Sequence, residues 1–472
     1  MKGKIVLKAN NLVLGRGRLA ARWLLRMDTP LPERTDAELD AEQDRHYAWN
    51  FAVNLIDNVF FWFSLSFISA TTILPLFVSK LTDSPIPIAL LAVLAQSSWF
   101  LPQLLAAGIT ERVPRMKPIV INLGFLAERF PMLLLPVAAL LSLRSPLLAL
   151  VVFFIGYGWH GFGAGIVAPG WSNLLARCFP VKRRGRFFGI ASFVGTALAT
   201  AGAFVSGWML NTFAYPTNFV YIFVIATAGV FVSWGFLSLT REPVGQDAAV
   251  PLPTRSPGQS RRKILAIVRG DHNFRRFLIA RVLSSLAAMG EGFLTVSAVR
   301  LWQVSDGSIA YFTAAMLLGQ TGGNLLAGFV ADRKGHKLSL EIGYLAMAGS
   351  FFIAWLAPDW VWYFAVFALL GIGAGSRIVS GVLIPLEFAH AEHRPSYVGI
   401  SNTTMGIGSA LAPLIGGLLA WIGYDILFAI GASLAVIAFA VMRWWVAEPR
   451  HGHLFDPTKG TRYESEAVEP AL

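Results

Sequence analysis

The sequence predicts an all-α membrane protein in which twelve transmembrane helices form two pseudo-symmetric halves of six helices each. Three observations predict this fold class. Of the 472 residues, 55% are hydrophobic and only 14% are charged, a composition that ordinary soluble proteins do not have. The apolar residues form twelve long runs, and a glycine-rich motif of the first half recurs 210 residues later in the second half.

The apolar runs are interrupted by few charges. Most of them reach the ~20 residues that an α-helix needs to cross about 30 Å of hydrocarbon, and the ninth is marginal in length. Strands of a membrane β-barrel would be about half as long and would alternate in polarity, so we expect helices. In chain order the runs are 51–79, 86–109, 118–142, 146–176, 188–210, 217–239, 277–299, 308–331, 339–357, 360–388, 397–421 and 424–446.

The basic residues predict the orientation of these helices. Most of the 39 Lys and Arg lie before the first run, after the last run or in loops that are internal if the N-terminus is cytoplasmic. Lys80, Arg144 and Arg300 mark the opposite side, which is the positive-inside pattern with both termini in the cytoplasm. Topology therefore explains the net charge of +12 without nucleic acid as a partner, and we expect an integral protein of the bacterial cytoplasmic membrane.

A polar stretch between the sixth and seventh runs divides the chain. It is rich in Pro, Gly and charge, and its last ten residues, RRKILAIVRG, predict a short helix along the cytoplasmic surface. The predicted organisation is a cytoplasmic N-terminal segment (1–50), a six-helix bundle (51–239), a cytoplasmic linker (240–276), a second six-helix bundle (277–446) and a cytoplasmic tail (447–472).

The two halves share a repeat. GFGAG at 161–165 recurs as GIGAG at 371–375, in the fourth and tenth runs. Other matches at the same spacing are Arg184 with Arg394, Gly189 with Gly399, Ile190 with Ile400 and Gly207 with Gly417. Small residues let neighbouring helices approach closely, so we interpret the strings as packing surfaces, with direct room for a solute as the alternative. Their glycines are Gly161, Gly163, Gly165, Gly371, Gly373 and Gly375.

The loop between the eighth and ninth runs reads GFVADRKGHKLSL at 328–340. It closely resembles the signature loop of the major facilitator superfamily, in which a glycine, an Asp-Arg pair, a second glycine and a basic cluster follow one another. The matching first-half sequence, AGITERVPRMKP at 107–118, is a weakened copy, in which Glu111 and Arg112 stand for the pair and Pro114 replaces the second glycine. The signature residues are Gly328, Asp332, Arg333, Gly335, His336 and Lys337.

The resemblance implies a secondary transporter whose two six-helix halves enclose a central cavity. It also implies that Asp332 lies near the start of the fifth span, around 185–188, when the cytoplasmic side is closed. Four ionisable residues fall on spans that line the cavity in that family: Asp57, His160, Glu291 and Arg377. A charge at the bilayer centre costs about 2.5–3.5 kcal/mol on insertion scales, so each retained charge needs a reason.

The residues suggest a role for each member of this set. Burial favours the neutral form of a carboxyl unless a cation lies beside it, so Glu291, near mid-span, is the expected proton carrier. Arg377 either neutralises Glu291 or binds an anionic substrate. Asp57 is expected to bind substrate or take part in coupling, with a structural pair near the cytoplasmic end as the alternative. His160 is either a packing residue or a binding residue, and Glu128 with its neighbour Arg129 is interpreted as scaffold.

These features predict a proton-coupled transporter of a small solute that works by alternating access. The sequence has no phosphate-binding loop, zinc-ligand spacing or nucleophile elbow, so we expect no catalytic residue, no cofactor and no metal, and the protein is not predicted to be an enzyme. The expected partners are a small-molecule substrate, protons and the lipid bilayer, and the expected state is a monomer. A transport-inactive receptor or scaffold and a drug efflux antiporter remain the alternatives.

Overall fold

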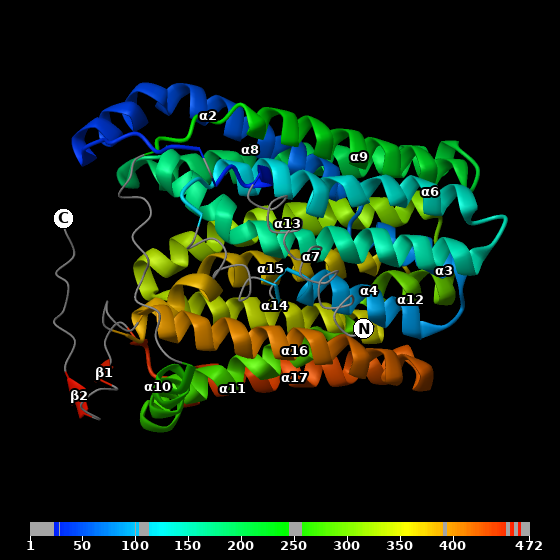
Figure 1. Ribbon diagram of the computed structural model, residues 1–472. Helices are drawn as coiled ribbons and strands as arrows, with labels where there is room; N and C mark the ends of the chain where they lie inside the picture. The colour runs from blue at the N-terminus through cyan, green and yellow to red at the C-terminus, as the bar shows by residue number, and fades with distance from the viewer. Residues whose placement is uncertain are drawn as a thin grey trace, which may run out of the picture.

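Long helices that run side by side make up nearly all of the structure (Figure 1). The computed structural model describes residues 23–27, 29–99, 101–102, 113–244, 257–389, 394–449, 454–456 and 461–463. Two three-residue strands, β1 (Leu454–Asp456) and β2 (Thr461–Tyr463), pair antiparallel beyond the last helix.

The first half of the chain forms one set of helices. We call it the first set: α2 (Asp36–Phe67), α3 (Ile73–Leu81), α4 (Pro85–Ser97), α6 (Leu134–Leu141), α7 (Pro146–Cys178), α8 (Val181–Thr212) and α9 (Thr217–Ser238). Their starts follow local capping rules. Thr35 and Glu38 form a capping box at α2, and Ser145 caps α7 ahead of a proline in its first turn.

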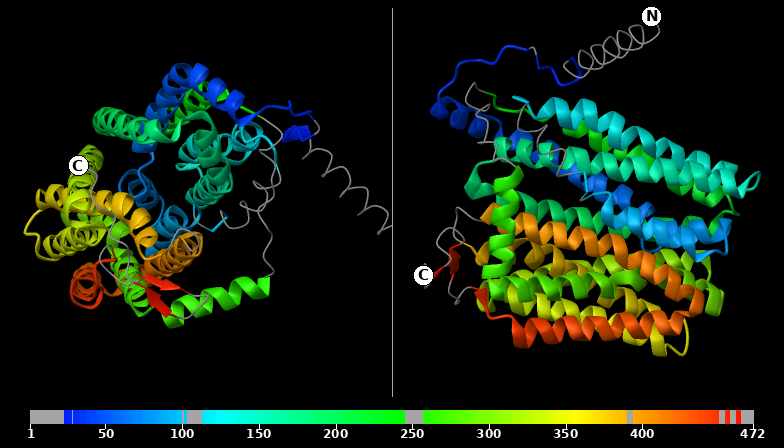
Figure 2. Two further views of the ribbon diagram at one scale, coloured as in Figure 1. Left: turned by 90° about the vertical axis from the view of Figure 1, so that its left-hand side faces the viewer. Right: turned by 60° about the horizontal axis from the view of Figure 1, so that its bottom comes forward.

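The second half forms a second set. A helix at the linker, α10 (Pro257–Gly270), precedes it, where a short helix is expected. The second set consists of α11 (His272–Ala287), α12 (Leu294–Trp302), α13 (Asp306–Lys334), α14 (His336–Leu356), α15 (Trp362–Glu387), α16 (Arg394–Ile422) and α17 (Tyr424–Trp445). Viewed along the bundle, the helices of the first set lie on one side and those of the second set on the other (Figure 2).

Ten helical stretches in the described residues are long and apolar enough to cross a membrane. The first and second expected spans are not among the ten. Helix α2 begins in a polar segment and carries Asp57, and the apolar part of the α4 helix, Pro85–Ala95, is short. The count is consistent with the twelve expected spans.

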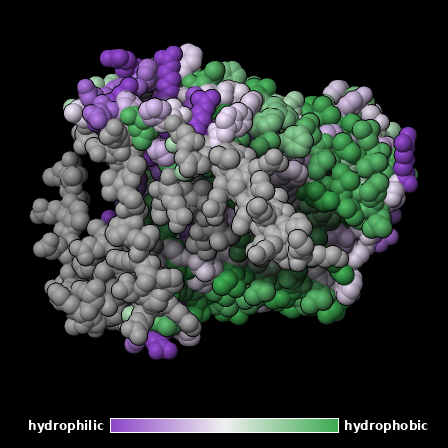
Figure 3. All heavy atoms as spheres, in the orientation of Figure 1, coloured by the Kyte–Doolittle hydropathy of each residue, from purple (hydrophilic) through white to green (hydrophobic). Residues whose placement is uncertain are grey.

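Figure 3 shows hydrophobic side chains covering the flank of the bundle and hydrophilic ones gathered towards its ends.

Three spans that the sequence predicts as continuous helices are broken. The first span is interrupted between Phe67, where α2 ends, and Ile73, where α3 begins. The third contains two π-helical segments, Ile119–Leu123 and Phe125–Arg129, and then a 3-10 turn, Phe130–Leu133. The seventh has a 3-10 segment, Ala288–Phe293, between α11 and α12. Single-turn π-bulges and mid-helix 3-10 stretches often mark functional sites.

Pro131 lies at the 3-10 turn of the irregular third span. It lacks a backbone N–H and its ring crowds the carbonyl four residues earlier, that of Ala127, which disfavours a regular α-helix there, although α7, α15 and α16 each continue through an internal proline. Side chains of neighbouring helices donate to carbonyls along this span. Thr227 of α9 donates to Met132 O (3.1 Å), and Trp234 of α9 donates to Ile121 O (3.0 Å). These bonds satisfy backbone groups that would otherwise be costly in an apolar environment.

The two sets contact one another through α4 with α16, α8 with α13, and α3 with α12 and α13. Two of the polar contacts between the sets lie at the end of the bundle where α3 and α12 lie, which we call the α3 end. There Lys80 forms an ion pair with Asp306 (Nζ to Oδ1, 2.8 Å), and Arg300 donates to the carbonyl of Asp83 (2.6 Å). These contacts join the sets at the α3 end.

Candidate functional site

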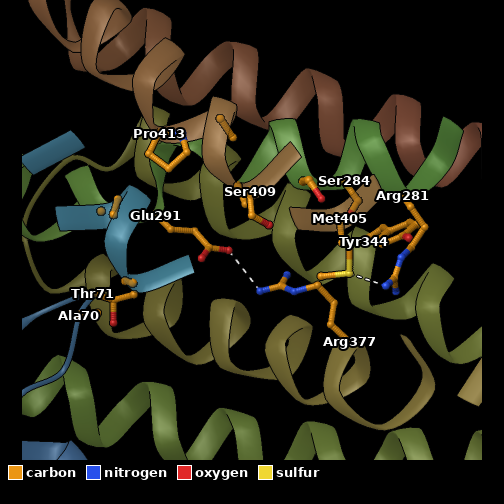
Figure 4. A pocket seen from close by; sticks show the side chains of 16 residues that line it. Ala70, Thr71, Arg281, Ser284, Glu291, Tyr344, Arg377, Met405, Ser409 and Pro413 are labelled. Carbon is orange, nitrogen blue, oxygen red and sulfur yellow. Dashed lines mark hydrogen bonds and ion pairs between the residues drawn. The ribbon is translucent and has the colours of Figure 1, made fainter. Parts of the chain in front are cut away.

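A cavity of about 80 Å³ lies where the two sets meet (Figure 4). From the first set its lining includes Ala70 and Thr71, in the break between α2 and α3. From the second set it includes Arg281 on α11, Glu291 in the 3-10 segment, and Arg377 on α15. We call it the charged cavity. The breaks in the first and seventh spans thus both open onto it.

Glu291 and Arg377 form an ion pair in this cavity. Arg377 Nη2 lies 3.2 Å from Glu291 Oε1, and the Glu291 side chain is buried. Glycines on both sides of Glu291 allow the segment to pack closely, since a Cβ on Gly290 would lie 2.8 Å from the Phe351 ring and one on Gly292 would lie 3.1 Å from Ala92. Of the two roles suggested for Arg377, neutralising Glu291 is the one that this contact satisfies.

Arg281 is a member of the site to which the sequence assigned no role. Its side chain is 5% exposed, and Nη1 donates to the carbonyl of Gly381 on α15 (3.1 Å). Nη2 contacts the sulfur of Met405 on α16, a weak acceptor, and Nε has no hydrogen-bond partner. Arg281 lies within the seventh apolar run, near its start, and an arginine inside such a run is itself a signal of function because the charge is costly in a membrane.

A second cavity, of about 270 Å³, adjoins the charged one and shares Ala70 and Thr71 with it. Its lining is largely aromatic and apolar. It comes from the first set and from α13, and includes Trp62, Leu65, Tyr157, His160, Thr313, Met316, Leu317 and Gln320. We call it the adjoining cavity. It offers space for an uncharged part of a solute next to the arginines.

His160 lines the adjoining cavity and also makes a structural hydrogen bond. Its Nδ1 lies 2.8 Å from the carbonyl oxygen of Glu128 in the irregular third span. A carbonyl only accepts, so Nδ1 carries the hydrogen, and in the neutral ring Nε2 remains an acceptor. His160 therefore satisfies a backbone group of the broken span and also lines the cavity.

Asp57 does not lie in the charged cavity. It lines a third cavity, of about 230 Å³, together with Glu128, Arg129 and the aromatic side chains Trp62 and Trp171. Its Oδ1 accepts a hydrogen bond from Ser233 of α9 (2.5 Å). The third cavity shares Trp62 with the adjoining one. The sequence did not show that Asp57 lies with Glu128 and Arg129, because the packing of the first span against the third brings them together.

Glu128 and Arg129 form an ion pair, although they are neighbours in sequence. Arg129 also lies over the ring of Phe61, with its guanidinium carbon 5.8 Å from the ring centre. Both residues are buried at the end of the second π-helical segment. The four predicted residues therefore divide, with Glu291 and Arg377 in one cavity, His160 in the next and Asp57 in a third.

The signature loop ends α13 and starts α14. Gly335 has a φ of 94°, a backbone conformation that favours glycine, and this residue terminates α13. His336 Nδ1 lies 3.1 Å from Ser380 Oγ, and Lys337 forms an ion pair with Glu341 (3.4 Å). These basic side chains contact helices of their own set. The predicted contact of Asp332 with the start of α8 remains a prediction, as do the roles of Gly328 and Arg333.

The first-half loop contacts a carboxylate to which the sequence analysis assigned no role. Glu111 and Arg112 lie outside the described residues, but Glu242, just after α9, accepts hydrogen bonds from the backbone N–H groups of Met116 (2.8 Å) and Lys117 (2.9 Å). It also pairs with Arg177 at the end of α7 (2.9 Å). A similar residue after α17 is Glu448, whose carboxylate lies beside Gly335. The feature of the sequence that could have identified both carboxylates is a Glu-Pro dipeptide after the last span of each half.

The glycine strings lie against neighbouring backbones. On α7, a Cβ on Gly165 would lie 2.6 Å from the carbonyl oxygen of Ser98, and one on Gly163 would lie 2.9 Å from the N of Glu128. Gly161 also faces Ser98. The string therefore allows close approach of the second and third spans to the fourth.

The second string on α15 has the equivalent neighbours. A Cβ on Gly375 would lie 2.6 Å from the N of Asn324 on α13, and one on Gly373 would lie 3.0 Å from the carbonyl oxygen of Gly343 on α14. Gly371 faces α13 too. In each half the outer glycines face one neighbouring span and the central glycine faces the next. This is the contact pattern that a duplicated unit would give.

Comparisons with known proteins agree with this architecture. The family model described as Major Facilitator Superfamily matches residues 282–467. The 3-(3-hydroxy-phenyl)propionate transporter of Escherichia coli (strain K12) is 26% identical over 42% of this chain and 47% of its own length. The niacin transporter of Acinetobacter baylyi is 24% identical over 32% of this chain and 35% of its own. The alignments thus span less than half the length of these relatives.

Solved structures show the same fold. A POT family transporter in complex with 5-aminolevulinic acid superposes with a TM-score of 0.65 at 14% identity, over 84% of this chain and 96% of the other. The xylose transporter XylE from E. coli, in a partially occluded inward open conformation, gives a TM-score of 0.60 at 15% identity, over 86% and 100%. The ten apolar helices and the match to the family model indicate an integral membrane protein.

Proposed function

The chain belongs to the major facilitator superfamily, and on that premise we propose that it is a secondary transporter that moves a small solute across a membrane. The observation that best supports this is the charged cavity. It is lined by both helix sets, and it contains the ion pair between the buried Glu291 and the half-buried Arg377. Relative movement of the two sets would open such a cavity to one side of the membrane and then to the other.

The proposal extends to coupling by protons through Glu291. In the present geometry Glu291 is paired with Arg377, and a proton on the carboxyl would remove this attraction and leave Arg377 available to a solute. A neutral carboxyl also crosses an occluded, water-poor state at a lower desolvation cost than a carboxylate. Asp57, in its own cavity with Arg129, is proposed as a second group that takes part in substrate binding or coupling.

The relatives support a small solute. The two named above are described by a phenylpropionate and by niacin, both small organic molecules. A third relative, a multidrug resistance protein of Salmonella choleraesuis, is 31% identical over 36% of its own length, which supports drug efflux as the second candidate. We propose a monomer in the bacterial cytoplasmic membrane, with α10 and both termini on the cytoplasmic side, because the basic residues lie there.

The test is solute flux in liposomes that contain the purified protein, with the internal pH recorded. We expect an imposed proton gradient to drive uptake of at least one solute from a panel of metabolites and drugs. Glu291→Gln is expected to abolish uphill uptake while solute exchange partly remains. Glu33→Gln is the matched control, since Glu33 is exposed. Binding without flux by the wild type would favour the receptor alternative, and unchanged proton-driven uptake in Glu291→Gln would reject Glu291 as the proton carrier.

A further inference from the structure

The charged cavity contains more positive than negative charge. Arg281 and Arg377 both line it. Among the described residues, Glu291 is the one acidic side chain in its lining. We infer that the transported solute is an anion whose carboxylate binds between Arg281 and Arg377, with its apolar body in the adjoining cavity. This inference rests on the proposed transport function and names the class of its substrate.

The charge of Arg281 has no counter-ion among the described residues. Its guanidinium contacts a carbonyl oxygen and a thioether sulfur, neither of which is charged, and its Nε makes no hydrogen bond. Arg377 is paired with Glu291 through Nη2, so Glu291 serves Arg377 and not Arg281. A guanidinium buried at membrane depth without an anion is costly, and an anionic ligand would remove that cost.

The shape of the two arginine guanidinium groups suits a carboxylate. A guanidinium presents parallel N–H donors that match the two oxygens of a carboxylate, and such bonds are shorter and stronger than neutral ones. Figure 4 shows Arg377 between Glu291 and Arg281, with the hydroxyls of Ser284 and Ser409 near the same space. A volume of about 80 Å³ is enough for a carboxylate and not for a large polar body.

The adjoining cavity suits the rest of the molecule. It is larger, about 270 Å³, and Trp62, Leu65, Tyr157 and Met316 contribute flat or apolar surface to it. Aromatic side chains of this kind pack well against another ring. Since both cavities are lined by Ala70 and Thr71, one small molecule would place its acid group beside the arginines and its apolar group here.

The test compares acids with their uncharged amides. The probes are benzoate with benzamide and 3-phenylpropionate with 3-phenylpropanamide, plus 2-phenylethylamine as a cation. Binding to the purified full chain is measured by tryptophan fluorescence and by thermal stabilisation, and flux is measured separately in liposomes. We expect at least one acid to bind and its amide to bind at least about ten-fold more weakly, which corresponds to about 1.4 kcal/mol.

Two variants of Arg281 and one control variant on the same helix separate the role of Arg281 from a general effect on folding. Arg281→Gln is expected to lose the preference for acid over amide, and Arg281→Lys to restore part of it because the charge returns without the planar fork. Arg275→Gln is the matched control on the same helix, where Arg275 is exposed. If Arg281→Gln does not fold, the comparison of acids with amides on the wild-type protein still tests whether the ligand is an anion.

The outcomes separate this inference from the proposed function. Acid binding with no flux of any probe would reject transport and leave the ligand class standing. Flux of the amides or of the amine at rates equal to those of the acids would reject the ligand class and leave transport standing. Binding of no acid in the panel, or an unchanged acid preference in a folded Arg281→Gln protein, would also overturn the inference.

Discussion

The substitution Gly375→Ala tests whether the glycine strings are packing surfaces. A Cβ added to Gly375 would lie 2.6 Å from the N of Asn324 and 2.7 Å from the carbonyl oxygen of Gln320, both backbone atoms of α13. Contacts of this kind are normally near 3.5 Å, so α13 and α15 would have to separate by roughly 0.8 Å. Overpacking of this size costs about 1–3 kcal/mol.

A second effect opposes this cost. Alanine is favoured over glycine in a helix by about 1 kcal/mol, so the expected net change for Gly375→Ala is a loss of about 0–2 kcal/mol. Gly322→Ala on α13 is the matched control, because a Cβ there has no atom within 4 Å. The control should keep the whole helix-propensity gain. The two variants should therefore differ by about 1–3 kcal/mol in the free energy of unfolding.

The assay is the melting temperature of the purified protein in one detergent, followed by tryptophan fluorescence at one scan rate, since membrane proteins often unfold irreversibly. We expect Gly375→Ala to melt a few degrees below Gly322→Ala. A melting temperature for Gly375→Ala equal to or above that of Gly322→Ala would refute the packing argument. It would leave the alternative that the string provides room for a solute.

Three further outcomes are expected. Asp332→Asn should favour the state open to the cytoplasm, and unchanged labelling of cysteines placed in the cytoplasmic part of the cavity would count against this. Reversing the charge of Lys80 should open the α3 end, and reversing the charge of Asp306 as well should close it again. The expected effect is about 0.2–1 kcal/mol, because the ion pair is partly exposed. Equal labelling of cavity cysteines from the α3 end in the single and the double variant would contradict this. His160→Leu would leave the Glu128 carbonyl without its hydrogen bond, which should cost about 1–3 kcal/mol of stability and lower the melting temperature. His160→Gln should lose less stability. Equal melting temperatures of the two variants would argue against this role.

Composition and hydropathy were sufficient to predict the helical membrane fold, because a chain with so few charges can bury its backbone in a bilayer only as helices or closed barrels. The positions of the breaks were harder to predict. Pro131 signals one of them in the sequence, but the π-helical geometry also depends on donors such as Trp234, which come from a distant helix. Sequence reasoning therefore predicted the spans and not their irregular segments.

The candidate site was predicted in part for a similar reason. The sequence shows that Glu291 and Arg377 lie within spans, and a contact between them was one of two alternatives. It does not show how each helix is rotated, which decides that Arg281 faces the same cavity and that Asp57 turns towards Ser233 instead. A period of 3.6 residues assigns a face within one helix, but the choice of neighbouring helix is a tertiary property.

The breaks in the first and seventh spans explain why the charged cavity lies where it does. In the first span the break exposes the carbonyl of Thr71, which accepts a hydrogen bond from Thr295 of α12 (2.7 Å), and in the seventh span the break contains Glu291. Each break thus places polar groups at the junction of the two sets, where an intact helix would present only side chains. Irregular backbone is tolerated at membrane depth where it is buried in protein or lines a cavity. The same residues that interrupt the helices therefore form the surface at which the two sets and a solute would meet.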